Sequence, residues 1–450
     1  MSLSIVQAVA VIKRSVSHCL TPQAIEQACQ AEKYSWRQRE LGPAKTLHAF
    51  ITQVLHGNVA CSHTVRLAGL DCSTEAYCQA RARIPLSVYQ RLLRQTSETM
   101  RQTCEVPRWH GHRTFLVDGS SFSMSDTPEL QTHFGQPTGQ RAGCGFPSAH
   151  LLTMFDAASG LLVKQDAFAL RTHDLSRITP WHSELQEGDV LVGDTAFASY
   201  AHLALLLRAK LQGVFRIHQR QLVSFRKDRR LVGKQPKGTV ATHAGSRLVR
   251  KLGKYDQVVE YSKPATRPEW ISKQAYAALP EKILVREVRY LTKLKGGRTR
   301  VVTLVTTLLD TELYPAQELA ALYGRRWRIE TNLGHLKTTM GMDVLHCHTM
   351  AGVLKELTIY ALVYNLTRLV MLQAAEEQAT SVERVSFVDA LRWLSEACRE
   401  HPQTLRLILN PHRPNRHEPR VRKRRPKEYP VMRIPRQQLR ERLSTKQLAA

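Results

Sequence analysis

The chain has 450 residues, enough for two or three domains, and 43% of them are apolar, which indicates a mainly folded protein. Its 65 Lys and Arg outnumber 38 Asp and Glu and give a net charge of +27, which excludes an acidic protein and predicts a polyanionic partner. The most apolar stretch, 357–372, contains Asn365 and Arg368, so we expect no membrane span. No basic segment precedes the apolar residues 5–12, and nine cysteines lack a paired framework, so we expect a cytoplasmic protein and no secretory signal.

Apolar periodicity predicts a helical first part of the chain, followed by strands that alternate with helices. Thr21 and Pro22 are typical of an N-cap and a first helical turn. Helices are expected at 23–31, 46–55 and 87–103. Strands are expected at 114–117, 151–155, 161–163, 190–192 and 214–217, and a helix at 199–210. This alternation favours an α/β core with a mixed sheet.

Short basic strands come next, with glycines between them and a hairpin signal at Gly296-Gly297. Residues 219–300 contain 21 Lys or Arg and 6 Asp or Glu, interleaved with apolar runs and aromatic residues. This pattern favours a phosphate-binding surface on a folded sheet over a solvated face. The chain is predicted to be helical again over 315–398. Residues 412–428, with eight basic and two acidic side chains, are expected to lie in a tail, and whether that charge binds phosphate or is only solvated stays open.

Two aspartates directly follow predicted buried strands. Asp118 comes after 115–117, and Asp194 comes after 190–193. Open α/β sheets present their sites at the carboxyl ends of such strands. One aspartate of this kind usually caps a turn, but two in the same core, each beside a glycine that permits a tight turn, favour a functional site.

A helix near residue 330 carries the strongest pattern. At 3.6 residues per turn, four polar residues project from one strip of this helix: Tyr323, Arg326, Glu330 and Lys337. The alternative is that Arg326 and Glu330 form only an i, i+4 salt bridge on a solvated face. Trp327, however, indicates that much of the helix is partly buried, so its polar strip should face a cleft.

The three carboxylates of Asp118, Asp194 and Glu330 suit Mg²⁺, which prefers oxygen ligands and bridges to substrate phosphates. Two such ions would activate an attacking water or 3′-hydroxyl and stabilise the leaving oxygen. Arg326 and Lys337 are then candidates to bind flanking phosphates. Tyr323 is a candidate to hydrogen-bond to, or stack on, the terminal nucleotide.

These residues resemble those of a known family, the DDE transposases of bacterial insertion sequences in the group marked by Tyr-x2-Arg-x3-Glu-x6-Lys. That signature is met in full here. Further similar segments are 117–124 and 192–197 around the two aspartates, 76–83 in the helical first part, and 171–175 between the aspartates. The resemblance does not extend past about residue 410.

The resemblance implies a ribonuclease H-like catalytic core interrupted by a basic β-rich insertion. It implies a DNA transposase that binds the terminal inverted repeats of its element, cleaves the ends, often through a hairpin, and joins the 3′ ends to target double-stranded DNA. It also implies two Mg²⁺ ions, for which Mn²⁺ can substitute, a homodimer in the synaptic complex, and a bacterial cytoplasmic protein associated with the nucleoid. Trp270 in the insertion is implied as a residue that stacks on a flipped base, with a buried aromatic as the equal alternative.

Five regions follow from these arguments. We expect an N-terminal helical DNA-binding domain at 1–105, the first part of the core at 106–218, the insertion at 219–310, the second part of the core at 311–400 and a basic tail at 401–450. Two other functions stay open: a catalytically silent DNA-binding regulator derived from a transposase, and a metal-dependent nuclease without strand transfer.

Overall fold

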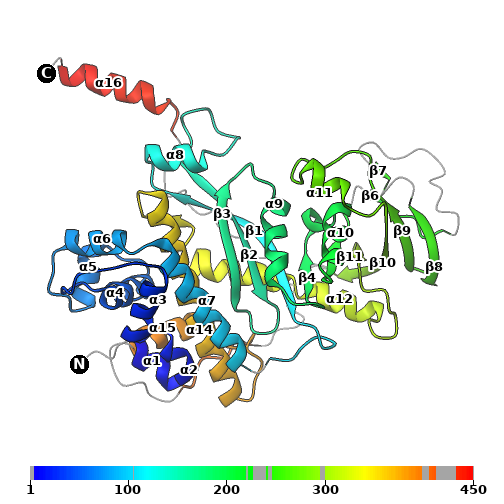
Figure 1. Cartoon of the computed structure of the whole chain (residues 1–450), viewed down its shortest axis with the longest axis horizontal. Coiled ribbons are helices and arrows are strands. Elements are labelled where there is room, and N and C mark those ends of the chain that lie inside the picture. The colour runs from blue at the N-terminus through cyan, green and yellow to red at the C-terminus, as the bar shows by residue number, and fades with distance from the viewer. Residues whose placement is uncertain are drawn as a thin grey trace.

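The computed structural model describes residues 5–104, 106–218, 221–226, 240–241, 246–293, 299–397, 405–411 and 432–448. Its first part is helical, as predicted, and Thr21 caps a helix by accepting a hydrogen bond from the Ala24 N–H at 3.3 Å. The helices are α1 (Ile5–Ile12), α2 (Arg14–His18), α3 (Pro22–Ala31), α4 (Pro43–Leu55), α5 (Cys61–Leu67), α6 (Thr74–Arg83) and α7 (Leu86–Thr103). They form the blue group at one side of the molecule (Figure 1).

A mixed sheet forms the centre, which confirms the α/β prediction. Its first five strands stand in the order β3-β2-β1-β4-β5, and only β2 runs against the others. This order agrees with the ribonuclease H-like core that the resemblance implies. The strands are β1 (Thr114–Met124), β2 (Ser148–Asp156), β3 (Leu162–Ala169), β4 (Val190–Gly193) and β5 (Gln212–Arg216).

The basic segment after β5 continues the same sheet. It adds strands in the order β11-β10-β9-β8 beyond β5, which makes a ten-stranded sheet when the short strand β12 (Val344–Leu345) beside β1 is included. These strands are β8 (Arg247–Gly253), β9 (Asp256–Ser262), β10 (Lys282–Lys293) and β11 (Thr299–Thr306), with β6 (Gln221–Leu222) and β7 (Val240–Ala241) paired separately and α11 (Lys273–Ala277) between β9 and β10. The predicted hairpin at Gly296-Gly297 and much of 219–245 lie outside the described residues.

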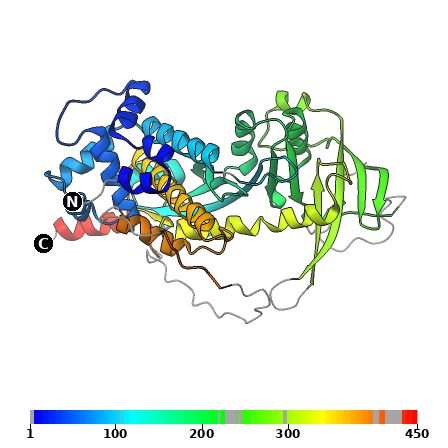
Figure 2. The ribbon, with the colours of Figure 1, turned by 90° about the horizontal axis from the view of Figure 1, so that it is seen from below.

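Helices cover both faces of the sheet and bury one hydrophobic core on each. Residues of α7, α12 (Ala316–Gly324), α13 (Trp327–Gly334) and α14 (Met350–Glu377) pack on the face that carries Leu116, Val192 and Val214. Figure 2 shows the yellow segment with α12 and α13 running along this side of the sheet. The opposite face packs against α9 (Asp174–Ile178), the 3-10 helix η1 (Thr179–Glu184) and α10 (Tyr200–Arg208).

Helix α14 is long and apolar enough to cross a membrane, but 89% of its apolar window is buried inside the protein. Asn365, a polar residue within this apolar run, forms hydrogen bonds inside the core. The amide donates to the Ser97 Oγ and the Leu162 carbonyl, each at 2.9 Å, and accepts from the Leu162 N–H at 2.8 Å. Polar groups in that position join α14 to α7 and β3, which is the role of a central core helix.

The C-terminal region differs from the predicted tail. Residues 436–448 form helix α16 (Arg436–Leu448), which stands away from the body near α8 (Pro128–Phe134) in Figure 1. Arg436 anchors it by pairing with Asp126 and donating to the carbonyls of Gly143 and Gly145. Helix α15 (Phe387–Ala397) ends the preceding helical region, and the basic run 412–428 lies outside the described residues.

Candidate active site

Asp118 and Asp194 lie next to each other at the end of the β1–β4 ladder. The two strands pair in parallel up to Leu116 and Val192, so each aspartate stands two residues further along its own strand. Asp194 directly follows β4 and accepts from the Ala196 N–H at 2.8 Å, which caps the short 3-10 helix η2 (Thr195–Phe197). Neighbouring parallel strands therefore bring the two carboxylates together, as the sequence predicted.

The prediction that Asp118 follows the end of its strand is wrong. β1 continues to Met124 because Asp118 to Ser123 pair with β2 on the other side. Only the ladder to β4 ends here, and Asp118 marks that point from inside a longer strand.

The two neighbouring glycines serve packing and not a tight turn. Neither has a positive φ. A Cβ on Gly119 would lie 2.6 Å from His150 Nε2, and one on Gly193 would lie 2.7 Å from the Phe197 ring. Both positions therefore exclude larger residues because side chains from the far face of the sheet press against the backbone beside each aspartate.

Glu330 lies on α13, which packs on one face of the sheet. The predicted single helix is in fact α12 and α13, joined through Arg325 and Arg326 with helical dihedral angles, and it then changes to a π-helix, η3, over His335–Thr339. Gly334, a weak helix former, directly precedes the change, and π-turns are frequent at functional sites. Lys337 lies in this π-turn and donates to the Ser120 Oγ of β1 at 3.0 Å.

Arg326 connects two of the carboxylates. Its guanidinium donates to Asp118 Oδ2 at 3.0 Å and to Glu330 Oε1 at 3.1 Å. The simple surface salt bridge of Arg326 and Glu330 is therefore only part of the arrangement, because a third group from the sheet shares the cation. Tyr323 lies buried on the same side of the helix, at 8% exposure.

The charges of the other two carboxylates act on Asp118. Burial raises the pKa of Asp118 to about 6, the charges of Asp194 and Glu330 raise it as well, and Arg326 and the Gly119 N–H oppose the shift. Burial also raises the pKa of Tyr323 and lowers that of Lys337. Like charges gathered in a partly dry site are typical of positions that bind a cation.

The donor set fits a divalent ion chemically, because all three groups offer carboxylate oxygens. Among the described residues, no three His, Cys, Asp or Glu side chains are placed so that they could already share one ion. The Arg326 guanidinium supplies the positive charge between Asp118 and Glu330 instead.

Arg216 belongs to the site and was missed from the sequence. It is the last residue of β5, and the pairing of Gly193 with Phe215 places it beside Asp194 on the neighbouring strand. Its Nε is buried and has no hydrogen-bond partner among the described residues. Burial lowers the pKa of Arg216, and the charges of Arg300 and Arg326 lower it further. A basic residue at the end of the third parallel strand is the signal in the sequence that indicates Arg216.

Trp270 and Trp327 were both singled out in the sequence, and only Trp327 differs from its prediction. Trp270 is half-buried against the His173 ring, with centroids 6.4 Å apart, and lines a cavity with residues of η1 and α10. These contacts agree with the alternative of a packed aromatic, and stacking on a flipped base stays a prediction. Trp327, expected to be partly buried, is instead 56% exposed at the start of α13, and the Arg326 guanidinium lies 5.6 Å from its ring centroid.

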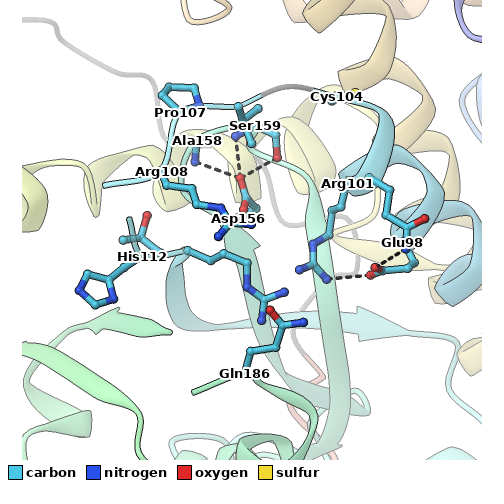
Figure 3. Close-up of a pocket in the computed structure, with 14 residues that line it drawn as sticks. Glu98, Arg101, Cys104, Pro107, Arg108, His112, Asp156, Ala158, Ser159 and Gln186 are labelled. Carbon is cyan, nitrogen blue, oxygen red and sulfur yellow. Dashed lines mark hydrogen bonds and ion pairs between the residues drawn. The ribbon is translucent and has the colours of Figure 1, made fainter. Parts of the chain in front are cut away.

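A separate cavity of about 780 Å³ opens where β1 begins, between the end of α7 and the turn after β2 (Figure 3). Both of its described carboxylates, Glu98 and Asp156, have hydrogen-bond donors within the protein. Asp156 accepts from the N–H groups of Ala158 and Ser159, and Glu98 accepts from Arg101 at 3.0 Å. The carboxylates of this cavity are therefore already bound by groups of the protein.

Comparison with known proteins identifies the family. The profile of the transposase DDE domain matches residues 109–366, more than half of the chain. The chain belongs to the DDE transposases. The match spans all three carboxylates and confirms the resemblance found in the sequence.

A relative supports the same assignment. Transposase InsG for insertion sequence element IS4 from Escherichia coli (strain K12) is 25% identical over 375 residues, which cover 79% of this chain and 78% of the relative. Among solved structures, the piggyBac transposase synaptic complex with hairpin DNA is similar with a TM-score of 0.45 at 9% identity, covering 86% of this chain and 79% of that one. The protein is thus a DNA transposase of an insertion sequence, an enzyme that acts on DNA, and DDE transposases generally use divalent metal ions.

Proposed function

We propose that this transposase binds the terminal inverted repeats of its own insertion sequence, hydrolyses the phosphodiester bonds at the ends and joins the 3′ ends to target DNA. The convergence of Asp118, Asp194 and Glu330 beneath a strip of cations carries this proposal. Two Mg²⁺ ions held by these carboxylates, or Mn²⁺ in their place, would activate the attacking water or 3′-hydroxyl and stabilise the leaving oxygen.

The remaining groups of the site bind and orient the DNA. Arg326 and Arg216 present guanidinium groups that pair well with phosphate oxygens. Lys337, fixed by its hydrogen bond to Ser120, adds a point charge near β1. Tyr323 places a phenol beside Arg326, where it can donate to a phosphate or support a base. Together they would hold the backbone on either side of the bond that is cut.

Basic residues away from the site fit a DNA surface. The edge strand β8 exposes Arg247, Arg250 and Lys251, and Lys254 follows it in the turn to β9. Such a row of cations suits backbone contacts that carry no sequence information. We assign recognition of the inverted repeats to the N-terminal helices. The complex that holds both ends would be a homodimer, and it would act in the cytoplasm at the nucleoid.

Cleavage of a plasmid that carries the gene with its native flanks tests the proposal. Wild type should make breaks at the element's ends that require Mg²⁺, and Glu330→Gln should bind the flanks without cutting them. If a folded wild-type protein binds the flanks but never cuts with any divalent ion, it is a silent DNA-binding regulator. If it cuts but never yields strand-transfer products, it is a nuclease.

A further inference from the structure

The guanidinium of Arg326 lies where a cation is required. Its side chain is only 13% exposed, and its two terminal nitrogens pair with Asp118 and Glu330 at 3.0 and 3.1 Å. Both oxygens of Asp118 are thereby engaged, because Oδ1 accepts from the Gly119 N–H at 2.9 Å. Arg326 thus shares its single positive charge between two of the three carboxylates.

A divalent ion bound to the same carboxylates would compete with this arrangement. It needs oxygens that Arg326 now occupies, and it would bring two positive charges close to a third one. The guanidinium would have to leave at least one carboxylate. Phosphate oxygens are the partners for which a displaced guanidinium is best suited, since they accept the same paired hydrogen bonds.

We propose that Arg326 is an internal counter-ion that alternates between the carboxylates and a DNA phosphate. Without DNA it pairs with Asp118 and Glu330 and keeps divalent-ion affinity low. When a DNA phosphate draws it away, the carboxylates are free for the ions. The inference rests on the proposed function of these carboxylates as metal ligands.

Such an exchange couples the two ligands. If DNA strengthens ion binding by a given factor, the ion must strengthen DNA binding by the same factor. The consequence for the enzyme is that its cutting chemistry is assembled on DNA and weak in its absence. A purely structural Arg326 would instead hold the carboxylates in place, and its loss would weaken ion binding.

Mn²⁺ binding, followed by the electron paramagnetic resonance signal of the free ion, separates these cases without any measurement of activity. In the absence of DNA, Arg326→Gln should bind Mn²⁺ roughly 5- to 30-fold more tightly than wild type, the range expected from releasing two partly exposed ion pairs. Arg326→Lys, which can reach one carboxylate at a time, should fall between the two. The matched control is Arg328→Gln on the same helix, because Arg328 pairs with Glu383 and donates to the Ala157 carbonyl, away from the carboxylates.

A second titration adds a short duplex taken from the flank of the gene. The duplex should tighten Mn²⁺ binding to wild type and leave the Mn²⁺ affinity of Arg326→Gln unchanged. Equal or weaker Mn²⁺ binding by folded Arg326→Gln and Arg326→Lys overturns the inference. If Asp118→Asn and Glu330→Gln bind Mn²⁺ as wild type does, the ions sit elsewhere, and the proposed metal site itself is wrong.

Discussion

Arg286 and Arg326 both pair with carboxylates, and they do so in opposite ways. Arg286 in β10 is 1% exposed, and it donates twice to Asp256, at 2.8 and 2.6 Å, and to the Tyr314 carbonyl at 2.7 Å. Arg326 serves two carboxylates with a third nearby, and its Nε is buried without a hydrogen-bond partner among the described residues. The first arginine completes a structural joint between the added strands and the core. The second leaves a site whose charges are balanced only in part, which is what binding of ions and phosphates requires.

The largest expected effect removes a carboxylate from the unbalanced site. Asp194→Asn keeps the shape and the cap on η2 but loses a charge that the proposed ions need, so cleavage should fall about a thousand-fold or more. Binding to the ends and the melting temperature should change little. Gel assays of cleavage and binding check this, with Asp166→Asn as the control, since Asp166 pairs only loosely with Arg177 at 3.8 Å. A mutant that still cuts at the wild-type rate would remove Asp194 from the mechanism.

Loss of the Arg286–Asp256 pair should lower the stability of the protein. Arg286→Met leaves the Asp256 carboxylate and the Tyr314 carbonyl without their donor, so unfolding should become easier by about 3–5 kcal/mol. Urea unfolding of this variant, compared with Arg247→Met on the exposed edge strand, measures the difference. The contrast between the two arginines fails if Arg326→Gln destabilises the protein as much as Arg286→Met does.

Replacing Asp118 by Asn should have opposite effects on activity and on stability. Its pKa is raised from 3.8 to about 6, so the folded protein holds the proton more tightly than the unfolded chain does. Folding is therefore favoured by this group below about pH 4, and that contribution disappears as the pH rises to about 6 and above. Asp118→Asn should accordingly stabilise the protein at pH 7.5 by about 1–3 kcal/mol while abolishing cleavage. Wild-type cleavage should increase with pH through about 6, because an ion needs the deprotonated ligand.

Unfolding of wild type and Asp118→Asn at pH 4 and pH 7.5 measures this effect directly. The stability difference should appear at pH 7.5 and nearly vanish at pH 4. If Asp118→Asn is less stable than wild type at both pH 4 and pH 7.5, favourable contacts stabilise the Asp118 carboxylate as they do that of Asp256. The contrast between the two arginine sites would then be wrong.

The sequence was sufficient for much of this site. Fixed spacing on a helix identified Tyr323, Arg326, Glu330 and Lys337, and strand patterns identified the two aspartates, because both signals are local. Which partners these groups choose is set by tertiary packing. No local pattern shows that Arg326 reaches Asp118 across 208 positions, that the helix widens into a π-turn that contains Lys337, or that a single sheet extends through the basic segment.

Arg216 shows the limit most clearly, and it gives the smallest expected effect. Its place beside Asp194 depends on the register of β4 and β5, which the sequence does not reveal. Arg216→Ala should weaken end binding about ten-fold and make the slope of log K against log salt shallower by about 0.9, while the melting temperature stays within a few degrees. Arg208→Ala at the end of α10 is the control for a lost positive charge away from the carboxylates. An unchanged salt slope for Arg216→Ala would mean that the Arg216 guanidinium stabilises the charge of Asp194 and does not bind a DNA phosphate. The site would then resemble the Arg286–Asp256 pair more closely than we infer.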